Sequence, residues 1–181
     1  MAGTTAGSTA NISLAIRSGG QSGVDRAALD VAKALQISYR GWCPRGGWAE
    51  DFPAPPGLLA VYPRLTETPS AHPEQRSAWN VRDSDATLIV TPNADVRFSP
   101  GTAFTRLCAE LIFVKPLHVA DFVRDDSCET AAVWLRACVH AHSGDEFLLN
   151  IAGPRESESH GINGRAVQVL TRLFDRVLSH H

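Results

Sequence analysis

Short apolar runs alternate with longer stretches of helical periodicity along most of the chain. The apolar runs hold Ile, Leu, Val and Ala with few charges, and most of them stop at a glycine, proline or aspartate. Runs of this length are typical of strands that are buried on both faces of a parallel sheet. The sequence therefore predicts strands over residues 12–18, 37–43, 85–92, 116–120 and 147–152.

Between these runs, apolar residues recur at spacings of three and four, as in Phe104, Leu107, Cys108 and Leu111. This spacing predicts a helix with one apolar face. The alternation of strands and helices predicts the α/β class, as a Rossmann-like, doubly wound parallel sheet flanked by helices. Helices are predicted over residues 27–35, 72–83, 101–114, 127–142 and 161–178, and an irregular loop rich in Gly, Pro and Trp over 44–56, which 62–69 extends.

The length of 181 residues fits one compact domain, which we assign to residues 12–181. Residues 1–11 are small and polar, without the basic and apolar regions of a signal peptide, and are predicted to form a disordered leader. No apolar run approaches the roughly 20 residues that a membrane span needs. These features predict a cytoplasmic protein.

Charge and cysteine usage narrow the function classes. The formal net charge is −2 and the pI is about 6.4, which argues against a nucleic-acid binder that works through a basic face. Of the basic residues, only Lys33 and Lys115 are lysines, and arginine is the side chain whose fork matches phosphate geometry. No C-x-x-C pair occurs among the cysteines, so we expect reduced thiols, with Cys43, which lies among Gly41, Trp42 and Pro44 in a predicted loop, as the one to examine.

A glycine-rich turn joins the first predicted strand to the first predicted helix. It reads Gly19-Gly20-Gln21-Ser22-Gly23-Val24-Asp25-Arg26. Glycines allow close approach of a ligand, and a helix N-terminus favours an anion, so the turn predicts a phosphate cradle. The sequence is neither G-x-G-x-x-G nor a Walker A loop. Two alternatives stay open: glycines that serve only helix–strand packing, and an Asp25 and Arg26 that pair with each other or cap the helix.

Polar groups also follow other predicted strands. In a doubly wound sheet the ligand lies outside the carboxyl ends of the strands, so these groups are expected to converge on one anion-binding cleft. Thr102 has the alternative role of an N-cap, and Arg155 that of a solvated surface residue. The groups in question are Thr91, then Gly101 and Thr102 at the start of a helix, and Gly153, Pro154, Arg155 and Ser157.

Asn80 and Asp83 precede a buried strand in the stretch W-N-V-R-D-S-D. They are candidates for hydrogen bonds to a heterocycle, with an ordinary helix cap as the alternative. The histidines include neither H-x₃-H nor H-E-x-x-H, and no G-x-S-x-G elbow is present. The sequence therefore predicts no metal ligands and no catalytic residues.

Six ordered motifs resemble the molybdenum cofactor (Moco) carrier protein family, a group of Rossmann-like proteins related to the LOG ("lonely guy") nucleotide phosphoribohydrolases of the SLOG superfamily. The resemblance covers residues from about 12 to 178. The motifs are S-G-G-Q-S-G-V-D-R at 18–26, G-W-C-P-R-G-G-W-A-E-D at 41–51, T-E-T-P-S at 66–70, W-N-V-R-D-S-D-A-T-L-I at 79–89, P-G-T-A-F-T at 100–105 and N-I-A-G-P-R-E-S at 150–157.

The resemblance implies a protein that binds Moco, a Mo- or W-pyranopterin with a terminal monophosphate, and protects it or hands it on. It implies a recipient molybdoenzyme or insertase as partner and a homodimer or homotetramer. Trp42 and Trp48 are candidates for stacking on the pterin. The candidate cofactor-binding residues are Gly19, Gly20, Gln21, Ser22, Gly23, Asp25, Arg26, Asn80, Asp83, Thr91, Gly101, Thr102, Thr105, Gly153, Pro154, Arg155 and Ser157.

The alternative is a nucleotide-binding protein or a nucleoside monophosphate hydrolase like the LOG relatives. Those relatives use P-G-G-x-G-T-x-x-E, whose glutamate acts at the ribosyl carbon. Here Pro100-Gly101-Thr102 is followed by Thr105, which stands where that glutamate should be. A threonine supplies no carboxylate for this chemistry, so a carrier is favoured over an enzyme.

Overall fold

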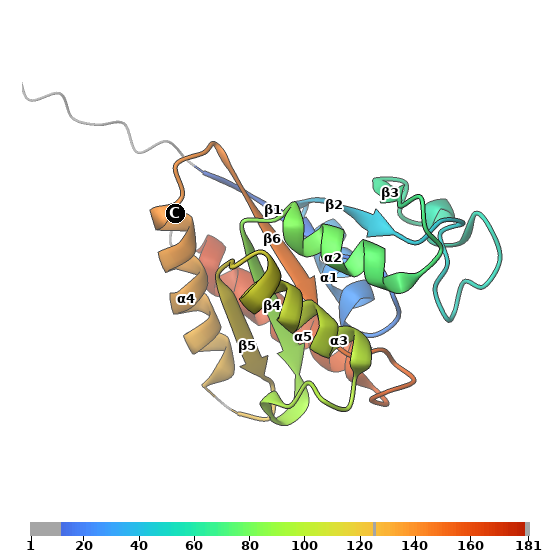
Figure 1. Ribbon diagram of the computed structural model, residues 1–181. Helices are drawn as coiled ribbons and strands as arrows, with labels where there is room; N and C mark the ends of the chain where they lie inside the picture. Colours follow the sequence, from blue (N-terminus) through green and yellow to red (C-terminus); the bar gives the residue numbers. More distant parts are fainter. Residues whose placement is uncertain (1–11, 125, 180–181) are drawn as a thin grey trace, which may run out of the picture.

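The computed structural model describes residues 12–124 and 126–179. The predicted leader over residues 1–11 lies outside the described residues. Within them, six strands form one sheet in the order β3-β2-β1-β6-β4-β5, and every neighbouring pair is parallel (Figure 1). The predicted fold class is confirmed. The strands are β1 (Ser13–Arg17), β2 (Ser38–Cys43), β3 (Leu65–Glu67), β4 (Ala86–Thr91), β5 (Leu117–Asp121) and β6 (Glu146–Ala152).

Strand β3 lies within a stretch that the sequence predicts as loop. It is three residues long and pairs with β2 alone, through Leu65 opposite Gly41. Only Leu65 of its residues is buried, so it carries no apolar run that marks it as a strand. An edge strand this short is specified by its partner and not by its own pattern.

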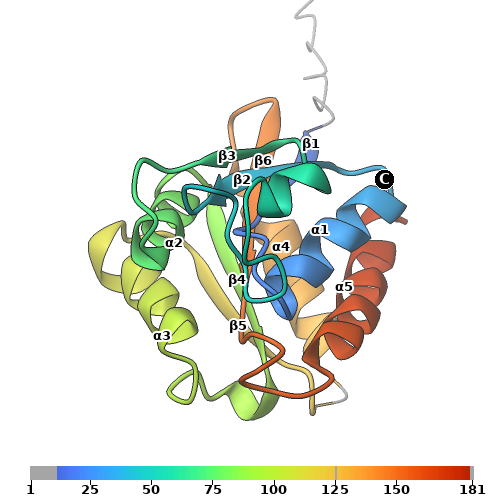
Figure 2. The same cartoon turned by 90° about the vertical axis from the view of Figure 1, so that its right-hand side faces the viewer.

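Helices cover both faces of the sheet. Helices α1, α4 and α5 lie on one face, and α2 and α3 lie on the other (Figure 2). The predicted helix over 101–114 is shorter than expected, because after Leu107 the chain continues as a π-helical turn over Cys108–Ile112. The helices are α1 (Val24–Ala34), α2 (Pro73–Arg82), α3 (Pro100–Leu107), α4 (Ser127–Ala141) and α5 (Ile162–Leu178).

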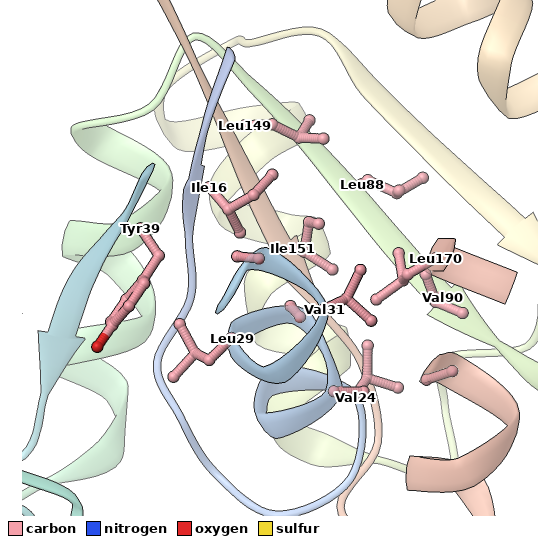
Figure 3. Close-up of a cluster of buried hydrophobic side chains, with 14 of the residues drawn as sticks. Ile16, Val24, Leu29, Val31, Tyr39, Leu88, Val90, Leu149, Ile151 and Leu170 are labelled. Carbon is pink, nitrogen blue, oxygen red and sulfur yellow. The ribbon is translucent and has the colours of Figure 1, made fainter. Parts of the chain in front are cut away.

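The larger hydrophobic core lies between the sheet and the α1–α5 layer (Figure 3). Ile16 of β1, Leu149 of β6 and Leu88 of β4 point into it, and Val24 and Leu29 of α1 cover them. All five side chains have no exposed surface. Burial of each stabilises the fold by roughly 1.5–3 kcal/mol, so this face carries much of the stability.

The opposite face of the sheet carries buried polar groups. Asn150 of β6 donates to the hydroxyl of Thr87 of β4 at 3.3 Å, and both residues are almost fully buried. On α2, Asn80 accepts from the backbone N–H of Trp42 at 2.8 Å and donates to its carbonyl at 2.9 Å. Helix α2 is therefore held to β2 by paired hydrogen bonds. Among the described residues, no helix is both long and apolar enough to cross a membrane.

Candidate functional site

A cleft of about 160 Å³ opens at the carboxyl ends of β1, β6 and β4, where the first turns of α2 and α3 face the loop after β6. This is the place where an open parallel sheet binds ligands. The lining residues are Gln21 and Asp25 from the α1 side, Pro73, Glu74, Arg76 and Ser77 of α2, Ser99, Pro100, Gly101, Thr102, Phe104 and Thr105 at and before α3, and Ala152, Gly153, Arg155 and Glu158 after β6.

A buried ion pair forms the floor of the cleft. Arg76 donates through Nη1 to Oδ2 of Asp25 at 2.7 Å, and the two side chains are 11% and 4% exposed. Burial raises the pKa of the Asp25 carboxyl, and Arg76 together with the backbone N–H groups of Gln21 and Gly153 opposes that rise. Nε of Arg76 is buried without a hydrogen-bond partner among the described residues. The guanidinium thus keeps one buried donor without a partner, which costs free energy.

Gly19 is required by this ion pair. A Cβ at Gly19 would lie 2.0 Å from Nη1 of Arg76 and 3.0 Å from Oδ2 of Asp25. The glycine therefore lets the guanidinium lie against the backbone, and it contacts the ion pair and not the ligand space.

The start of α3 is held by a network of oxygen atoms. The Ser99 side chain accepts from the backbone N–H of Thr102 at 3.4 Å, lies 2.7 Å from the Thr102 hydroxyl and donates to Glu158 at 2.7 Å. Ser99, and not Thr102, is the N-cap of α3. Nothing lies within 4 Å of a Cβ built on Gly101, so the backbone there is open to the cleft. An anion at this position meets the positive end of the helix dipole.

Arg155 and Glu74 complete the rim. The Arg155 guanidinium makes no hydrogen bond or ion pair within residues 12–124 and 126–179, while its backbone N–H donates to Glu158 at 2.9 Å. Glu74 is exposed in the first turn of α2. Arg155 is therefore a cation of the cleft whose guanidinium makes no direct contact with a carboxylate, although its charge helps to lower the pKa of Glu50.

The turn over residues 19–23 does not form an open phosphate cradle. The backbone N–H of Val24 donates to the carbonyl of Pro154 at 3.2 Å, and a Cβ at Gly23 would lie 2.3 Å from that carbonyl oxygen. The loop after β6 thus occupies the N-terminus of α1, where the sequence pattern places an anion. A Cβ at Gly20 would meet Leu58, Leu65 and Leu29, so this glycine serves packing.

Glu50 ties the long loop to this turn. It accepts from the hydroxyls of Ser22 and Ser157, the latter at 2.6 Å, and its backbone N–H donates to Gln21 at 2.9 Å. Burial opposes ionisation of Glu50, but the hydrogen bonds from Ser157 and Ser22 outweigh it and lower the pKa. Arg26 bonds the carbonyl of Gly20 and pairs with Asp51 at 2.8 Å. These side chains brace the loop outside the cleft.

The heterocycle candidates also lie outside the cleft. The Asn80 amide is hydrogen-bonded to the Trp42 backbone. Asp83 accepts a hydrogen bond from the Trp42 indole at 2.7 Å and pairs with Arg82. Trp42 itself packs edge-on against Trp79, with ring centroids 4.8 Å apart. The Thr91 hydroxyl donates to the carbonyl of Asp95 at 2.9 Å.

The structure divides the predicted site residues into three groups. Those that line the cleft are Gln21, Asp25, Gly101, Thr102, Thr105, Gly153 and Arg155. A separate hollow beside α1 and α5 is lined by Ser22, Gly23, Arg26 and Ser157. Neither hollow is lined by Gly19, Gly20, Asn80, Asp83, Thr91 or Pro154.

The sequence interpretation missed Arg76, Ser99 and Glu158. A signal for Arg76 is present: Arg76, Ser77 and Asn80 put polar groups on the face of α2 that turns toward the sheet. A polar inward stripe on a short helix indicates ion pairs or a ligand. Glu158 carries no such signal, because its role depends on the distant Ser99.

The comparisons with known proteins decide the family. The model of the circularly permutated YpsA SLOG family matches residues 16–174. The chain belongs to this family. A solved structure described as "Putative molybdenum carrier protein" from Syntrophus aciditrophicus SB is 36% identical, covers 90% of this chain and 95% of its own, and superposes with a TM-score of 0.74. No curated protein matches the chain.

Membership of the SLOG family agrees with the resemblance seen in the sequence. At the position of the LOG glutamate, the Thr105 hydroxyl donates to the carbonyl of Gly101 at 3.0 Å, within α3. Among the described residues, no group of three or more His, Cys, Asp or Glu side chains is placed to hold a metal ion.

Cys43 is expected to resist alkylation in the folded protein. It is the last residue of β2 and does not lie in a loop as predicted, because it pairs with β3 there. It is fully buried, and burial together with the charge of Glu67 raises its pKa to about 11. Because the thiolate is the reactive form, iodoacetamide at pH 8 should leave Cys43 unmodified until urea unfolds the chain, as followed by peptide mass spectrometry. Rapid modification of Cys43 in native buffer would contradict this placement.

Proposed function

We propose that this chain binds the molybdenum cofactor non-covalently in the cleft and holds it for transfer, as a carrier and not as an enzyme. The description of the Syntrophus structure as a molybdenum carrier supports the molybdenum cofactor as the ligand. The two chains are 36% identical over most of their lengths, which makes the comparison relevant. The recipient, a molybdoenzyme or an insertase, and assembly into a homodimer or homotetramer are parts of the same proposal.

The observation that carries the proposal is the combination of Arg76 and Arg155 with an open helix start. Arg76 and Arg155 both line the cleft, the Arg155 guanidinium makes no hydrogen bond to the described residues, and Gly101 exposes backbone at the N-terminus of α3. Charge-assisted hydrogen bonds from arginine to phosphate are about twice as strong as neutral ones. We therefore assign the terminal phosphate of the cofactor to the part of the cleft beside Arg155 and the N-terminus of α3.

The carboxylates of the cleft restrict the ligand further. Asp25 is neutralised by Arg76, and Glu158 accepts from Ser99 and from the backbone of Arg155. Glu74 is left at the rim as an acceptor without a partner among the described residues. This mixed set disfavours a triphosphate and suits a monophosphate that also carries N–H donors, as a pterin does.

The test is the content of protein purified without air from a host that makes the cofactor. After oxidation and denaturation, we expect the fluorescent pterin product together with Mo or W in near-equal amounts by mass spectrometry. Release of an adenine nucleotide without pterin would overturn the carrier proposal and favour nucleotide binding.

Arg155→Ala is expected to lower retention of the pterin by about tenfold to a hundredfold, because one charge-assisted hydrogen bond to phosphate is lost. Pterin fluorescence per mole of protein measures it. Arg136→Ala removes the same charge from α4, on the other face of the sheet, and should retain the pterin like the wild type. Equal retention by both variants would remove Arg155 from the site.

A further inference from the structure

A third space, distinct from the hollow beside α1 and α5, adjoins the cleft on the side of the long loop. It has a volume of about 420 Å³, is lined by Arg45, Gly46, Trp48, Pro53, Pro55, Ala71 and Pro73, and is called here the Trp48 pocket. Pro73, the first residue of α2, lines both the Trp48 pocket and the cleft. The two spaces therefore share a wall.

The cleft is too small for a whole nucleotide-sized or pterin-sized ligand. Pockets for such ligands occupy roughly 300–1,000 Å³, and the cleft has about 160 Å³. A ligand whose phosphate lies near Arg155 must extend into neighbouring space.

Charge decides between the two neighbouring spaces. The hollow beside α1 and α5 is lined by four acidic side chains, Asp30, Glu50, Asp51 and Glu156, against one arginine, Arg26, which is already paired with Asp51. The Trp48 pocket is lined by no acidic residue and holds one cation, Arg45. An anionic ligand is repelled from the first and attracted to the second.

The groups of the Trp48 pocket are suited to a flat ring. Trp48 is half-buried, and its indole N–H has no partner within the part of the chain that the structure describes. The Arg45 side chain is exposed and makes no hydrogen bond or ion pair to the described residues, although its backbone N–H donates to Ser70 at 3.1 Å. An aromatic ring and an unpaired guanidinium both stack on planar heterocycles.

The loop that carries Trp48 is fixed in place. Ala49 and Phe52 exchange backbone hydrogen bonds of 2.9 and 3.2 Å, and Leu58 donates to the carbonyl of Gly47 at 2.8 Å. A Cβ at Gly47 would lie 2.3 Å from the carbonyl oxygen of Pro56, so the segments around Gly47 and Pro56 are in direct contact. The loop around Trp48 is therefore preorganised, which lowers the entropic cost of binding a ligand.

We propose that the Trp48 pocket is the subsite for the planar heterocycle of the ligand whose phosphate lies in the cleft. Pro73 and the first turn of α2 lie between the two subsites, and Trp48 stacks on the ring. This assignment rests on the proposed function, because it takes the phosphate site as given.

Two probes that differ only in the ring test the subsite. One is a 6-alkylpterin with a terminal phosphate on its alkyl chain, and the other is the alkyl phosphate without the pterin. Calorimetry on the full chain should show that the pterin phosphate binds more tightly to the wild type. Trp48→Ala should weaken the pterin phosphate by roughly tenfold or more and leave the alkyl phosphate unchanged, while Trp48→Phe keeps most of the affinity.

The outcomes separate the two proposals. If Trp48→Ala binds the pterin phosphate as tightly as the wild type does, the subsite is wrong and the phosphate site stands. If neither probe binds the wild type, the proposed function fails and the subsite fails with it. If Trp48→Ala also lowers the affinity for the alkyl phosphate, Trp48 maintains the structure of the cleft and does not recognise the ring, and the subsite proposal is wrong.

Discussion

Asp25→Ala is expected to lower the free energy of unfolding by about 3–5 kcal/mol, because it leaves the Arg76 guanidinium buried without a counter-charge. The two side chains are joined at 2.7 Å and are only 4% and 11% exposed, so water compensates poorly for the lost partner. Urea denaturation followed by circular dichroism measures the change.

An exposed pair provides the matched control for Asp25→Ala. Asp95 and Arg97 form an ion pair in the loop before α3, and the Arg97 side chain is 88% exposed. Asp95→Ala should leave the urea midpoint unchanged. The double variant with Asp25→Leu and Arg76→Met should be more stable than Asp25→Ala alone, since no charge is left buried. A midpoint for Asp25→Ala equal to that of the wild type would mean that the pair is not buried as described.

Gly23→Ala is expected to destabilise the fold by about 2–4 kcal/mol, for two reasons that add. Gly23 has φ 78° and ψ −131°, a conformation that residues with a Cβ rarely adopt. The new methyl would also lie 2.3 Å from the backbone oxygen of Pro154, which cannot move without breaking its bond to Val24. The urea midpoint again measures the loss.

Gly164→Ala is the control for Gly23→Ala. Gly164 lies within α5, and nothing is found within 4 Å of a Cβ built there. Alanine is the better helix former by roughly 0.5–1 kcal/mol, so this variant should be more stable than the wild type. The two glycine variants are therefore expected to shift stability in opposite directions, and a shift of the same sign would contradict the backbone description of the turn.

Most of the fold could be predicted from the sequence because its elements follow local rules. Buried strands such as β4 and β6 are predominantly apolar, and α5 shows its inward face at every third or fourth residue. The edge strand β3 and the π-helical turn after α3 could not be predicted in this way. The first depends on hydrogen bonds to β2, and the second on packing at the end of a helix.

The candidate site was harder to predict, because one pattern serves two purposes. A strand, glycines and a helix start predict an anion site, yet the carbonyl of Pro154 occupies the N-terminus of α1. The open helix start is that of α3, beside Gly101. Whether a glycine makes room for a ligand or for the chain itself depends on residues more than a hundred positions away, which periodicity does not reveal.

The positions of the first and last described elements, β1 and α5, have a practical consequence. The backbone N–H of Ser13 donates to the carbonyl of Asp145 at 2.9 Å, so the start of β1 lies beside the connection that leads into β6. The last turn of α5 also lies at the end of the sheet where the strands begin, opposite the cleft (Figure 1). Joining the two ends and reopening the chain between α4 and β6 would rebuild the same sheet from a different starting strand. Attachment to a sensor surface at the start of β1 or at the last turn of α5 leaves the mouth of the cleft facing solution.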